Sequence, residues 1–212
     1  MRRLIKVGLT GGIATGKSMT LQRWQQAGAA GIDADQLAYQ TFTPDTPTWA
    51  EVVRAFGSEI LNKDRTINRP KLGEIVFTDG QKRLALNSIV HPVVRRMWTE
   101  EMEKLEHDGK TEVVVVSIPL LYEVAAETQF DCVIVVGCSE QTQIARLITQ
   151  KGLSETQARA RCRSQGPLQL KMDLADFVIW NDGTLRAFEE QANIIWATIN
   201  SESHETRGEH SG

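Results

Sequence analysis

The sequence predicts an α/β fold, in which a five-stranded parallel sheet lies between two layers of helices and carries a helical insert and a helical lid. Three observations lead to this prediction. Short apolar runs alternate with segments of helical pattern, which is typical of β-α-β units. One run, residues 112–117 (EVVVVS), is rich in β-branched residues, as expected of a parallel strand buried on both faces. A glycine-rich segment, residues 11–18, joins the first apolar run to the first helical one.

The expected strands and helices follow in order along the chain. The strands are expected at residues 4–9, 29–32, 112–117, 130–136 and 176–180. The first helix follows the glycine-rich segment and ends near Gly28, because glycine readily adopts the left-handed conformation that closes helices. Ser139 and Ser154 are expected to cap two later helices, and Gly152 ends the first of them near residue 150. Thr184 caps a closing helix that runs to about residue 199.

The second and third expected strands are separated by residues 33–111, whereas a simple crossover needs only about a dozen residues. This stretch therefore holds an inserted sub-domain. Its pattern is helical at residues 49–56 and 69–77, and residues 81–106 hold one or two further helices interrupted at Pro92. The expected division is a nucleotide-binding core (1–38, 110–140 and 172–200), a helical acceptor-binding insert (39–109), a lid (141–171) and a disordered polar tail (201–212).

Composition and charge narrow the classes of function. The chain has 212 residues and a formal net charge of −3, which argues against a general nucleic-acid binder. Its three cysteines form no C-x-x-C pair, which favours a reducing compartment and gives no sign of a metal site. The longest apolar run, residues 113–121, is too short to span a bilayer. We therefore expect a cytoplasmic protein with neither a membrane nor a nucleic acid as partner.

The segment of residues 11–18, GGIATGKS, matches the phosphate-binding pattern G-x-x-x-x-G-K-[ST] at every fixed position. Its glycines let the backbone curl so that successive N–H groups point at an anion, and the following helix adds its positive end. Lys17 would neutralise the β- and γ-phosphates, and the Ser18 hydroxyl would sit on Mg²⁺. The alternative is a chance match in a glycine-rich turn, which the strand before it and the helix after it disfavour.

Two carboxylates follow the second expected strand. Asp33 ends that strand, so it is expected at the same sheet edge as the phosphate-binding segment, where it could accept the proton of an acceptor hydroxyl. The alternative is that Asp33 only caps the next helix. Asp35 could reach the metal ion or could be a capping residue itself.

Two neighbouring classes of phosphate-binding protein do not fit. A guanine-nucleotide switch normally shows N-K-x-D and D-x-x-G, whereas residues 62–65 read NKDR and the second motif does not occur. An ATPase motor normally ends a strand such as 112–117 with an aspartate that holds Mg²⁺, whereas this strand runs into residues 117–119 (SIP). A small-molecule kinase fits best.

Several basic residues have two interpretations. Arg159, Arg161 and Arg163 lie within one helical turn, and either face of that helix could close over ATP or be a solvated surface. Arg146, on the preceding helix, is either a phosphate ligand or a surface charge. His91 has no accompanying nucleophile pattern, so a hydrogen-bonded histidine beside a helix break is as reasonable as a catalytic one.

Taken together, these stretches resemble the dephospho-CoA kinase family from about residue 4 to residue 200, with consistent spacing. The phosphate-binding motif is common to many kinases. Residues 32–35 (IDAD), His91-Pro92 and residues 119–123 (PLLYE), in that order, are far more specific. Further matching residues are Phe56-Gly57, Arg69, Leu72, Phe77, Leu86, Gln143, Arg146, Arg161, Gln165, Lys171, 175–179 (ADFVI), Asn181 and Gly183.

The resemblance implies ATP-dependent phosphorylation of the ribose 3′-hydroxyl of dephospho-CoA, on a P-loop NTPase-type core with a helical CoA-binding domain and a mobile lid. Asp33 would be the general base. From the motif, Lys17 is expected to be the second catalytic residue, and Ser18 and Asp35 are the residues expected at Mg²⁺, with the capping alternative for Asp35 open. The residues implied for ATP are Gly12, Ile13, Ala14, Thr15, Gly16, Lys17, Ser18, Arg146, Arg161, Asn181 and Gly183. Those implied for the acceptor are Thr10, Asp33, Phe77, His91, Leu121 and Glu123.

The chain departs from the family pattern at a few positions. Family members usually have glycine and serine where Ala14 and Thr15 stand, and Ala14 loses some backbone freedom but keeps its N–H donor. A basic residue is common in place of Tyr39, and an Arg-Asp pair in place of residues 150–151 (QK). The departure at Tyr39 affects one expected contact to the acceptor, and the departure at residues 150–151 removes one expected arginine of the lid.

The expected partners are ATP and dephospho-CoA, and a monomer is favoured. Two other functions remain open from the sequence. A nucleotide or nucleoside kinase would share the donor chemistry and differ in its acceptor pocket. A nucleotide-gated binding protein would hydrolyse ATP slowly and signal through the position of its lid.

Overall fold

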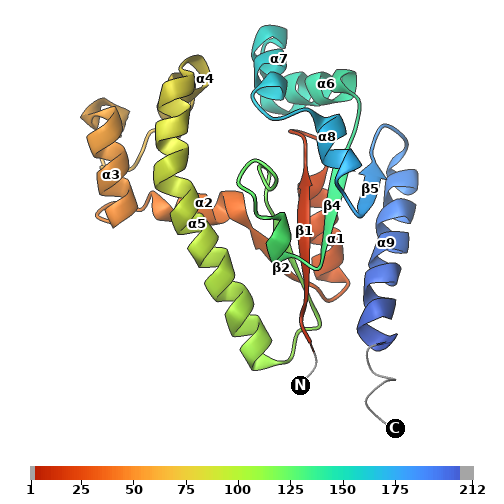
Figure 1. The fold of residues 1–212 in the computed structure, drawn as a ribbon. Coiled ribbons are helices and arrows are strands. Elements are labelled where there is room, and N and C mark those ends of the chain that lie inside the picture. Colours follow the sequence, from red (N-terminus) through yellow and green to blue (C-terminus); the bar gives the residue numbers. More distant parts are fainter. Residues whose placement is uncertain (1–2, 206–212) are drawn as a thin grey trace. The chain divides into compact units, whose positions relative to one another are not determined.

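The computed structural model describes residues 3–205 of the chain (Figure 1). Its strands are β1 (Ile5–Gly11), β2 (Ala30–Asp33), β3 (Val113–Ser117), β4 (Cys132–Gly137) and β5 (Phe177–Trp180). Its helices are α1 (Lys17–Gln26), α2 (Ala34–Thr41), α3 (Pro47–Phe56), α4 (Arg69–Thr78), α5 (Gly80–Asp108), α6 (Glu140–Lys151), α7 (Glu155–Arg163), α8 (Leu168–Asp173) and α9 (Leu185–Glu205). Short 3₁₀ turns lie at Ser58–Ile60 and Glu127–Gln129.

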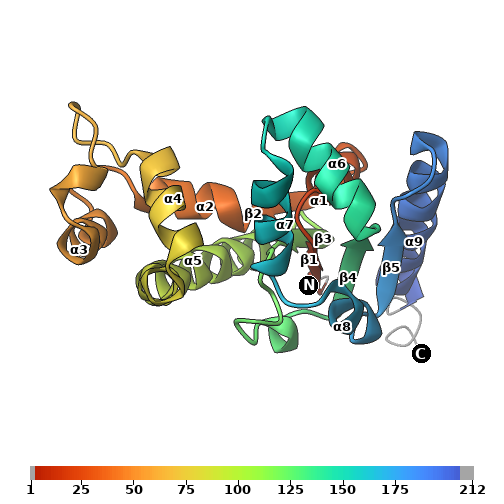
Figure 2. The same ribbon diagram turned by 90° about the horizontal axis from the view of Figure 1, so that it is seen from above.

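Within the described residues, the five strands form one sheet in the order β2-β3-β1-β4-β5. Strand β1 pairs in parallel with β3 and with β4, and β4 pairs in parallel with β5. The view from above in Figure 2 shows the strands side by side, with α9 next to the β5 edge. The prediction of an α/β fold on a five-stranded parallel sheet is confirmed.

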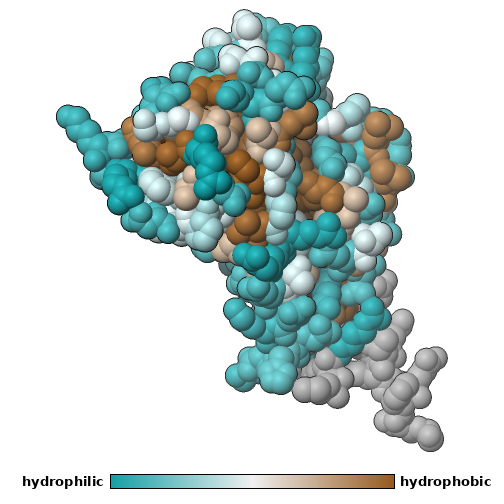
Figure 3. All heavy atoms as spheres, turned by 60° about the vertical axis from the view of Figure 1, so that its left-hand side comes forward, coloured by the Kyte–Doolittle hydropathy of each residue, from teal (hydrophilic) through white to brown (hydrophobic). Residues whose placement is uncertain are grey.

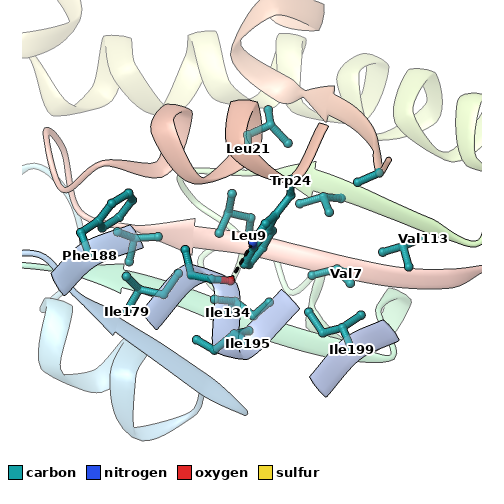
Figure 4. Packing of buried hydrophobic residues seen from close by; sticks show 14 residues of the cluster. Val7, Leu9, Leu21, Trp24, Val113, Ile134, Ile179, Phe188, Ile195 and Ile199 are labelled. Atoms are coloured by element: carbon teal, nitrogen blue, oxygen red, sulfur yellow. Dashed lines mark hydrogen bonds between the residues drawn. The ribbon is translucent and has the colours of Figure 1, made fainter. Parts of the chain in front are cut away.

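One face of the sheet is covered by α1 and α9. Alternate strand residues point to this face because successive side chains of a strand point to opposite sides, so Val7 and Leu9 of β1 share it. Trp24 of α1 is fully buried there, and its indole N–H donates to the Ala192 carbonyl of α9 at 3.0 Å, as Figure 4 shows. The core of this face consists of Val7, Leu9, Leu21, Trp24, Ala29, Val113, Val115, Ile134, Val136, Ile179, Phe188, Ala192, Ile195 and Ile199.

The opposite face is covered by α8 and by residues 118–131, here called the segment after β3. A Cβ atom at Gly8 would lie 2.8 Å from a Leu121 methyl group and 3.0 Å from the Phe130 ring, so these side chains pack directly against the backbone of β1. At Gly137 of β4, the atom nearest to an added Cβ atom would be the Met172 sulfur of α8. Helical and irregular segments therefore lie on both faces, in a three-layer arrangement.

The described part of the chain divides into two compact units: residues 33–101 form the second, and the described residues before and after them form the first. The second unit is helical and has its own buried residues: Leu37, Trp49, Val52, Phe56, Ile60, Ile67, Leu72, Val76, Val90, Val94 and Trp98. Its large exposed apolar side chains are Tyr39, Phe77 and Leu84. Figure 3, which brings the side with α3–α5 forward, shows apolar surface interspersed with polar surface.

Two expectations about helices are wrong. Helix α5 runs without a break through Pro92, although an interruption was expected there. A proline removes a single N–H donor, and the turns around it are held by the buried side chains of Val90, Val94 and Trp98. Helix α9 continues to Glu205 instead of ending near residue 199, because no glycine or proline occurs before Gly208. The rest of the tail expected to be disordered, residues 206–212, lies outside the described residues.

The predicted helix caps are confirmed. Ser139 accepts a hydrogen bond from the Thr142 N–H at 3.2 Å, and Ser154 forms a capping box with Gln157. Gly152 closes α6 in the left-handed conformation. Thr184 accepts from the Ala187 N–H at the start of α9.

Candidate active site

The loop between β1 and α1, residues 11–18, is here called the glycine loop. Two of its glycines are required by both conformation and space. Gly11 has φ 145°, and a Cβ atom there would lie 2.1 Å from the Val136 carbonyl oxygen. Gly16 has φ 113°, and a Cβ atom there would lie 2.5 Å from the Asn181 amide nitrogen. The loop therefore packs closely against the ends of β4 and β5.

The first carbonyl groups of the glycine loop are bonded from within the loop. Lys17 Nζ donates to the carbonyl oxygens of Gly11 at 3.2 Å and Gly12 at 2.8 Å. The buried Thr15 hydroxyl also donates to the Gly12 carbonyl, at 2.9 Å. These bonds curl the loop back on itself.

The next three carbonyl groups of the glycine loop are bonded by side chains from α6 and from the turn after β5. Each of these side chains is buried or half-buried. The bonds run from Gln143 Nε2 to Ile13 at 2.8 Å, from Arg146 to Ala14 at 3.1 Å and from Asn181 Nδ2 to Thr15 at 2.7 Å.

The carbonyl of Gly16, the last glycine of the loop, accepts a hydrogen bond from α1, from the Thr20 N–H at 3.1 Å. Every carbonyl of residues 11–16 thus accepts a hydrogen bond, from the loop itself, from α1, from α6 or from the turn after β5. Peptide N–H and C=O groups point in opposite directions, so this arrangement turns the N–H groups to the other side of the loop. A curled loop that ends at a helix N-terminus with its N–H groups inward is suited to a phosphate.

Arg146 joins the glycine loop to the turn after β5. Its guanidinium also donates to the Asn181 carbonyl at 2.8 Å. In the same turn, the Asp182 carboxylate accepts from the Ser139 N–H at the start of α6, at 3.0 Å. Burial acts to raise the pKa of Asp182, but hydrogen bonds from Thr142 and Ser139 lower it overall. The loop, α6 and the turn are therefore bonded into one scaffold.

Cys138 lies beside Arg146, with its sulfur 3.8 Å from the guanidinium. Burial raises the pKa of this thiol to about 11. The thiol is therefore protonated at neutral pH, which makes Cys138 a poor nucleophile.

A second cluster lies at the segment after β3. The buried Thr10 hydroxyl, at the end of β1, donates to the Pro119 carbonyl at 3.3 Å. Lys171 donates to the same carbonyl at 2.9 Å and pairs with Glu123 at 2.8 Å. Leu121 is fully buried. Three residues predicted for the acceptor, Thr10, Leu121 and Glu123, are thus brought to one segment.

The other predicted acceptor residues belong to the second unit. Asp33 is the N-cap of α2, and its Oδ1 accepts from the N–H groups of Asp35 at 2.9 Å and Gln36 at 3.4 Å. The capping role considered for Asp33 is therefore observed. Phe77 is 44% exposed on α4, and His91 is half-buried on α5.

Tyr39 of α2 stands where the resemblance suggests a basic residue. The Arg69 guanidinium lies over its ring, 4.0 Å from the centroid. This is a cation–π contact within the second unit. A positive charge is therefore present beside this position.

Two further residues predicted for ATP are Arg161 and Gly183. Arg161 is half-buried on α7, where the neighbouring Arg159 pairs with Glu155 at 2.8 Å. Gly183 is exposed in the turn that precedes α9. Their roles toward ATP stay predictions.

Residues 3–205 contain neither a cluster of metal-ligating side chains nor a helix that could cross a membrane. No three His, Cys, Asp or Glu residues between residues 3 and 205 are grouped so that they could hold a metal ion. In the same part of the chain, no helix combines the length and the apolar character needed for a membrane crossing.

Comparison with known proteins identifies the family. The sequence matches the family model described as dephospho-CoA kinase over residues 5–187. The chain belongs to the dephospho-CoA kinase family. A dephospho-CoA kinase of Streptomyces avermitilis is 40% identical over 203 residues, 95% of this chain and 97% of that protein. One from Bacillus cereus is 41% identical over 191 residues, 90% of this chain and 95% of that protein. The solved dephospho-CoA kinase of Campylobacter jejuni superimposes with a TM-score of 0.69 at 28% identity, covering 94% of this chain and 98% of that one.

Sequence reasoning on this member of the dephospho-CoA kinase family missed several residues of the site. Gln143 and Lys171 were noted only as matching residues, and Asp182 was not singled out. No local pattern marks them, since each is defined by a bond to a residue far away in the sequence. The usable signal was that Gln143 and Lys171 match the family pattern.

The conformation of Ala14 leads to a stability prediction. Ala14 has φ 57°, a left-handed conformation that glycine adopts without strain. We expect Ala14→Gly to stabilise the fold by about 0.5–1 kcal/mol, measured by urea unfolding without nucleotide. The control is Ala145→Gly in α6, which should destabilise by about 1 kcal/mol. Equal losses in both variants would contradict the argument.

The half-buried His91 leads to a prediction about pH. Burial lowers the pKa of its ring below the ordinary value of about 6.5. The folded protein therefore binds fewer protons there than the unfolded chain, so stability falls as pH drops below about 6.5. We expect the unfolding free energy of His91→Gln to fall less between pH 7.5 and 5.5 than that of the wild type, in urea titrations at both pH values.

The control for His91 is His107→Gln, since His107 is exposed on the same helix, α5. This variant should keep the wild-type dependence on pH. If His91→Gln also keeps it, the ring at position 91 is not what links stability to pH.

Proposed function

We propose that the protein transfers the γ-phosphoryl group of ATP to the ribose 3′-hydroxyl of dephospho-CoA, giving coenzyme A and ADP. This is the last step of coenzyme A synthesis. The observation that carries the proposal is the glycine loop, whose carbonyl groups at residues 11–16 all accept hydrogen bonds, so that its N–H groups are turned to the side where a phosphate would bind. The acceptor is supported by relatives named dephospho-CoA kinases that match over nearly the whole chain.

On the donor side, the N–H groups of residues 12–18 and the N-terminus of α1 bind the phosphates. Lys17 exchanges its bonds to Gly11 and Gly12 for the β- and γ-phosphates, which places a positive charge where negative charge spreads during transfer. Arg146 and Asn181 act on the loop backbone, which they hold in shape. Asn181 and Gly183 border the adenine base of ATP, and Arg161 approaches ATP when the lid closes.

On the acceptor side, Asp33 orients the 3′-hydroxyl and accepts its proton. Its Oδ1 accepts from the N–H groups of Asp35 and Gln36, and its Oδ2 is the oxygen proposed to accept the proton of the substrate. Phosphoryl transfer has a loose transition state, and much of the effect therefore comes from placing the hydroxyl in line with the phosphorus. Thr10, Phe77, His91, Leu121 and Glu123 form the surroundings of the acceptor.

The residues present fit a magnesium ion bound together with ATP. Ser18 is exposed in the first turn of α1, where its hydroxyl can be a ligand, and Asp35 is exposed two residues after Asp33. Mg²⁺ retains several waters and is usually held by phosphates and one or two protein groups, so no cage of carboxylates is required. When bound, it neutralises charge on the β- and γ-phosphates.

A substrate comparison tests the acceptor. A coupled assay of ADP release is run with dephospho-CoA, AMP, CMP and adenosine as acceptors, each with saturating ATP and Mg²⁺. We expect the highest kcat/KM on dephospho-CoA. The highest value on AMP or another nucleotide would identify a nucleotide kinase instead, and ATP hydrolysis without any acceptor effect would favour a nucleotide-gated binding protein.

Asp33 offers a clean test of the proposed base. Asparagine caps helices as well as aspartate does, so Asp33→Asn keeps the bonds to the N–H groups of α2 while it removes the proton acceptor. We expect kcat to fall by about 100-fold or more, with ATP affinity unchanged. Steady-state kinetics and calorimetric titration with ATP measure the two quantities.

Two outcomes decide the role of Asp33. Wild-type turnover in Asp33→Asn would mean that the carboxylate is only a cap. The control Asp33→Ala removes both functions, so it should show the same loss of kcat and, in addition, a loss of stability of about 1 kcal/mol.

A further inference from the structure

Lys171 of α8 is a buried lysine. It is 3% exposed, although lysine is almost never buried unless it is paired. Its ammonium group is 2.8 Å from Glu123 Oε1 and donates to the Pro119 carbonyl at 2.9 Å. Both partners lie in the segment after β3.

The two partners of Lys171 are bonded further. Glu123 Oε1 also accepts from the Gly166 N–H at 3.2 Å, in the connection between α7 and α8. The Pro119 carbonyl also accepts from the Thr10 hydroxyl at 3.3 Å, one residue before the glycine loop. A single ion pair therefore connects the end of the predicted lid, the segment after β3 and the end of strand β1.

The exposure of the two partners is unequal. The Glu123 side chain is 31% exposed and remains partly hydrated, whereas the Lys171 side chain is 4% exposed. Lys171 therefore needs Glu123 and Pro119 as hydrogen-bond partners in place of water, while Glu123 could be solvated without Lys171. A buried ion pair is weak evidence for a contribution to stability, but its hydrogen bonds fix geometry.

We propose that Glu123 and Lys171 are a pair of positioning residues that fix the C-terminal end of the lid to the segment after β3. The proposal rests on the proposed function, because it concerns the same transfer. Glu123 then acts through Lys171 and Gly166 instead of only touching the acceptor. By holding the Pro119 carbonyl against Thr10, the pair keeps the segment after β3 in register with the start of the glycine loop.

The proposal predicts which kinetic constants change. The bonds that hold the glycine loop, from Gln143, Arg146 and Asn181, do not involve the pair, so ATP binding should be retained. The acceptor hydroxyl should be less well aligned with the γ-phosphate, and a displacement of about 1 Å can lower the rate about 100-fold. We expect Lys171→Met to lower kcat about 10- to 100-fold, with less than a two-fold change in the KM for ATP.

The experiment compares four variants with the wild type: Lys171→Met, Lys171→Arg, Glu123→Gln and the double variant Glu123→Gln/Lys171→Met. The acceptor is the one that the wild type uses best in the substrate comparison, so a wrong acceptor assignment does not affect this test. Activities are expressed per molecule that binds ADP. The matched control is Lys110→Met, which removes an ion-paired lysine that is 81% exposed.

A second readout does not depend on turnover. Hydrogen exchange at the Gly166 amide should be faster in Glu123→Gln and in Lys171→Met than in the wild type, because its acceptor loses its charge in the first variant and is released from the ion pair in the second. The double variant should lose no more activity than the worse single variant, and Lys171→Arg should recover part of it.

Three results would overturn the proposal. One is wild-type kcat per ADP-binding molecule in Lys171→Met, which would leave the pair with a structural role at most. Another is additive losses in the double variant, which would mean that the residues act separately. The third is an unchanged exchange rate at Gly166 in both single variants.

Discussion

The structure of the candidate site depends on how the carbonyl groups of residues 11–16 are satisfied. A loop that presents its N–H groups to a phosphate must turn its carbonyl groups into the protein, where each of them needs a donor. Here the donors come from the loop itself, from α1, from α6 and from the turn after β5. Without these donors, the curled backbone would leave polar groups buried and unpaired.

This requirement explains why residues far apart in the sequence meet at the loop. The parallel order β3-β1-β4-β5 places the ends of these strands at one edge of the sheet, so the turn after β5 and the start of α6 reach the loop. Arg146 bonds both to the loop and to Asn181, and Asp182 bonds to the N-terminus of α6. The glycine loop, the N-terminal half of α6 and the turn after β5 are therefore bonded to one another within the first unit.

The sequence predicted the features that local chemistry decides. The β-branched run of β3 and the caps at Ser139 and Ser154 depend on neighbours in the chain, and all were confirmed. The break at Pro92 was wrong because buried side chains on both sides of the proline hold α5 together. The burial of Lys171 and the bond from Gln143 to Ile13 depend on tertiary contacts that no local pattern reports.

The central claim is that the N–H groups of the glycine loop bind phosphate because its carbonyl groups are held by the protein. The most direct measurement is a backbone amide NMR titration of the protein with ADP and Mg²⁺. We expect large shifts at the amides of residues 12–18, with the side-chain amide signal of Gln143, which bonds to Ile13, nearly unmoved. Shifts concentrated elsewhere, with the amides of residues 12–18 unchanged at saturation, would contradict it.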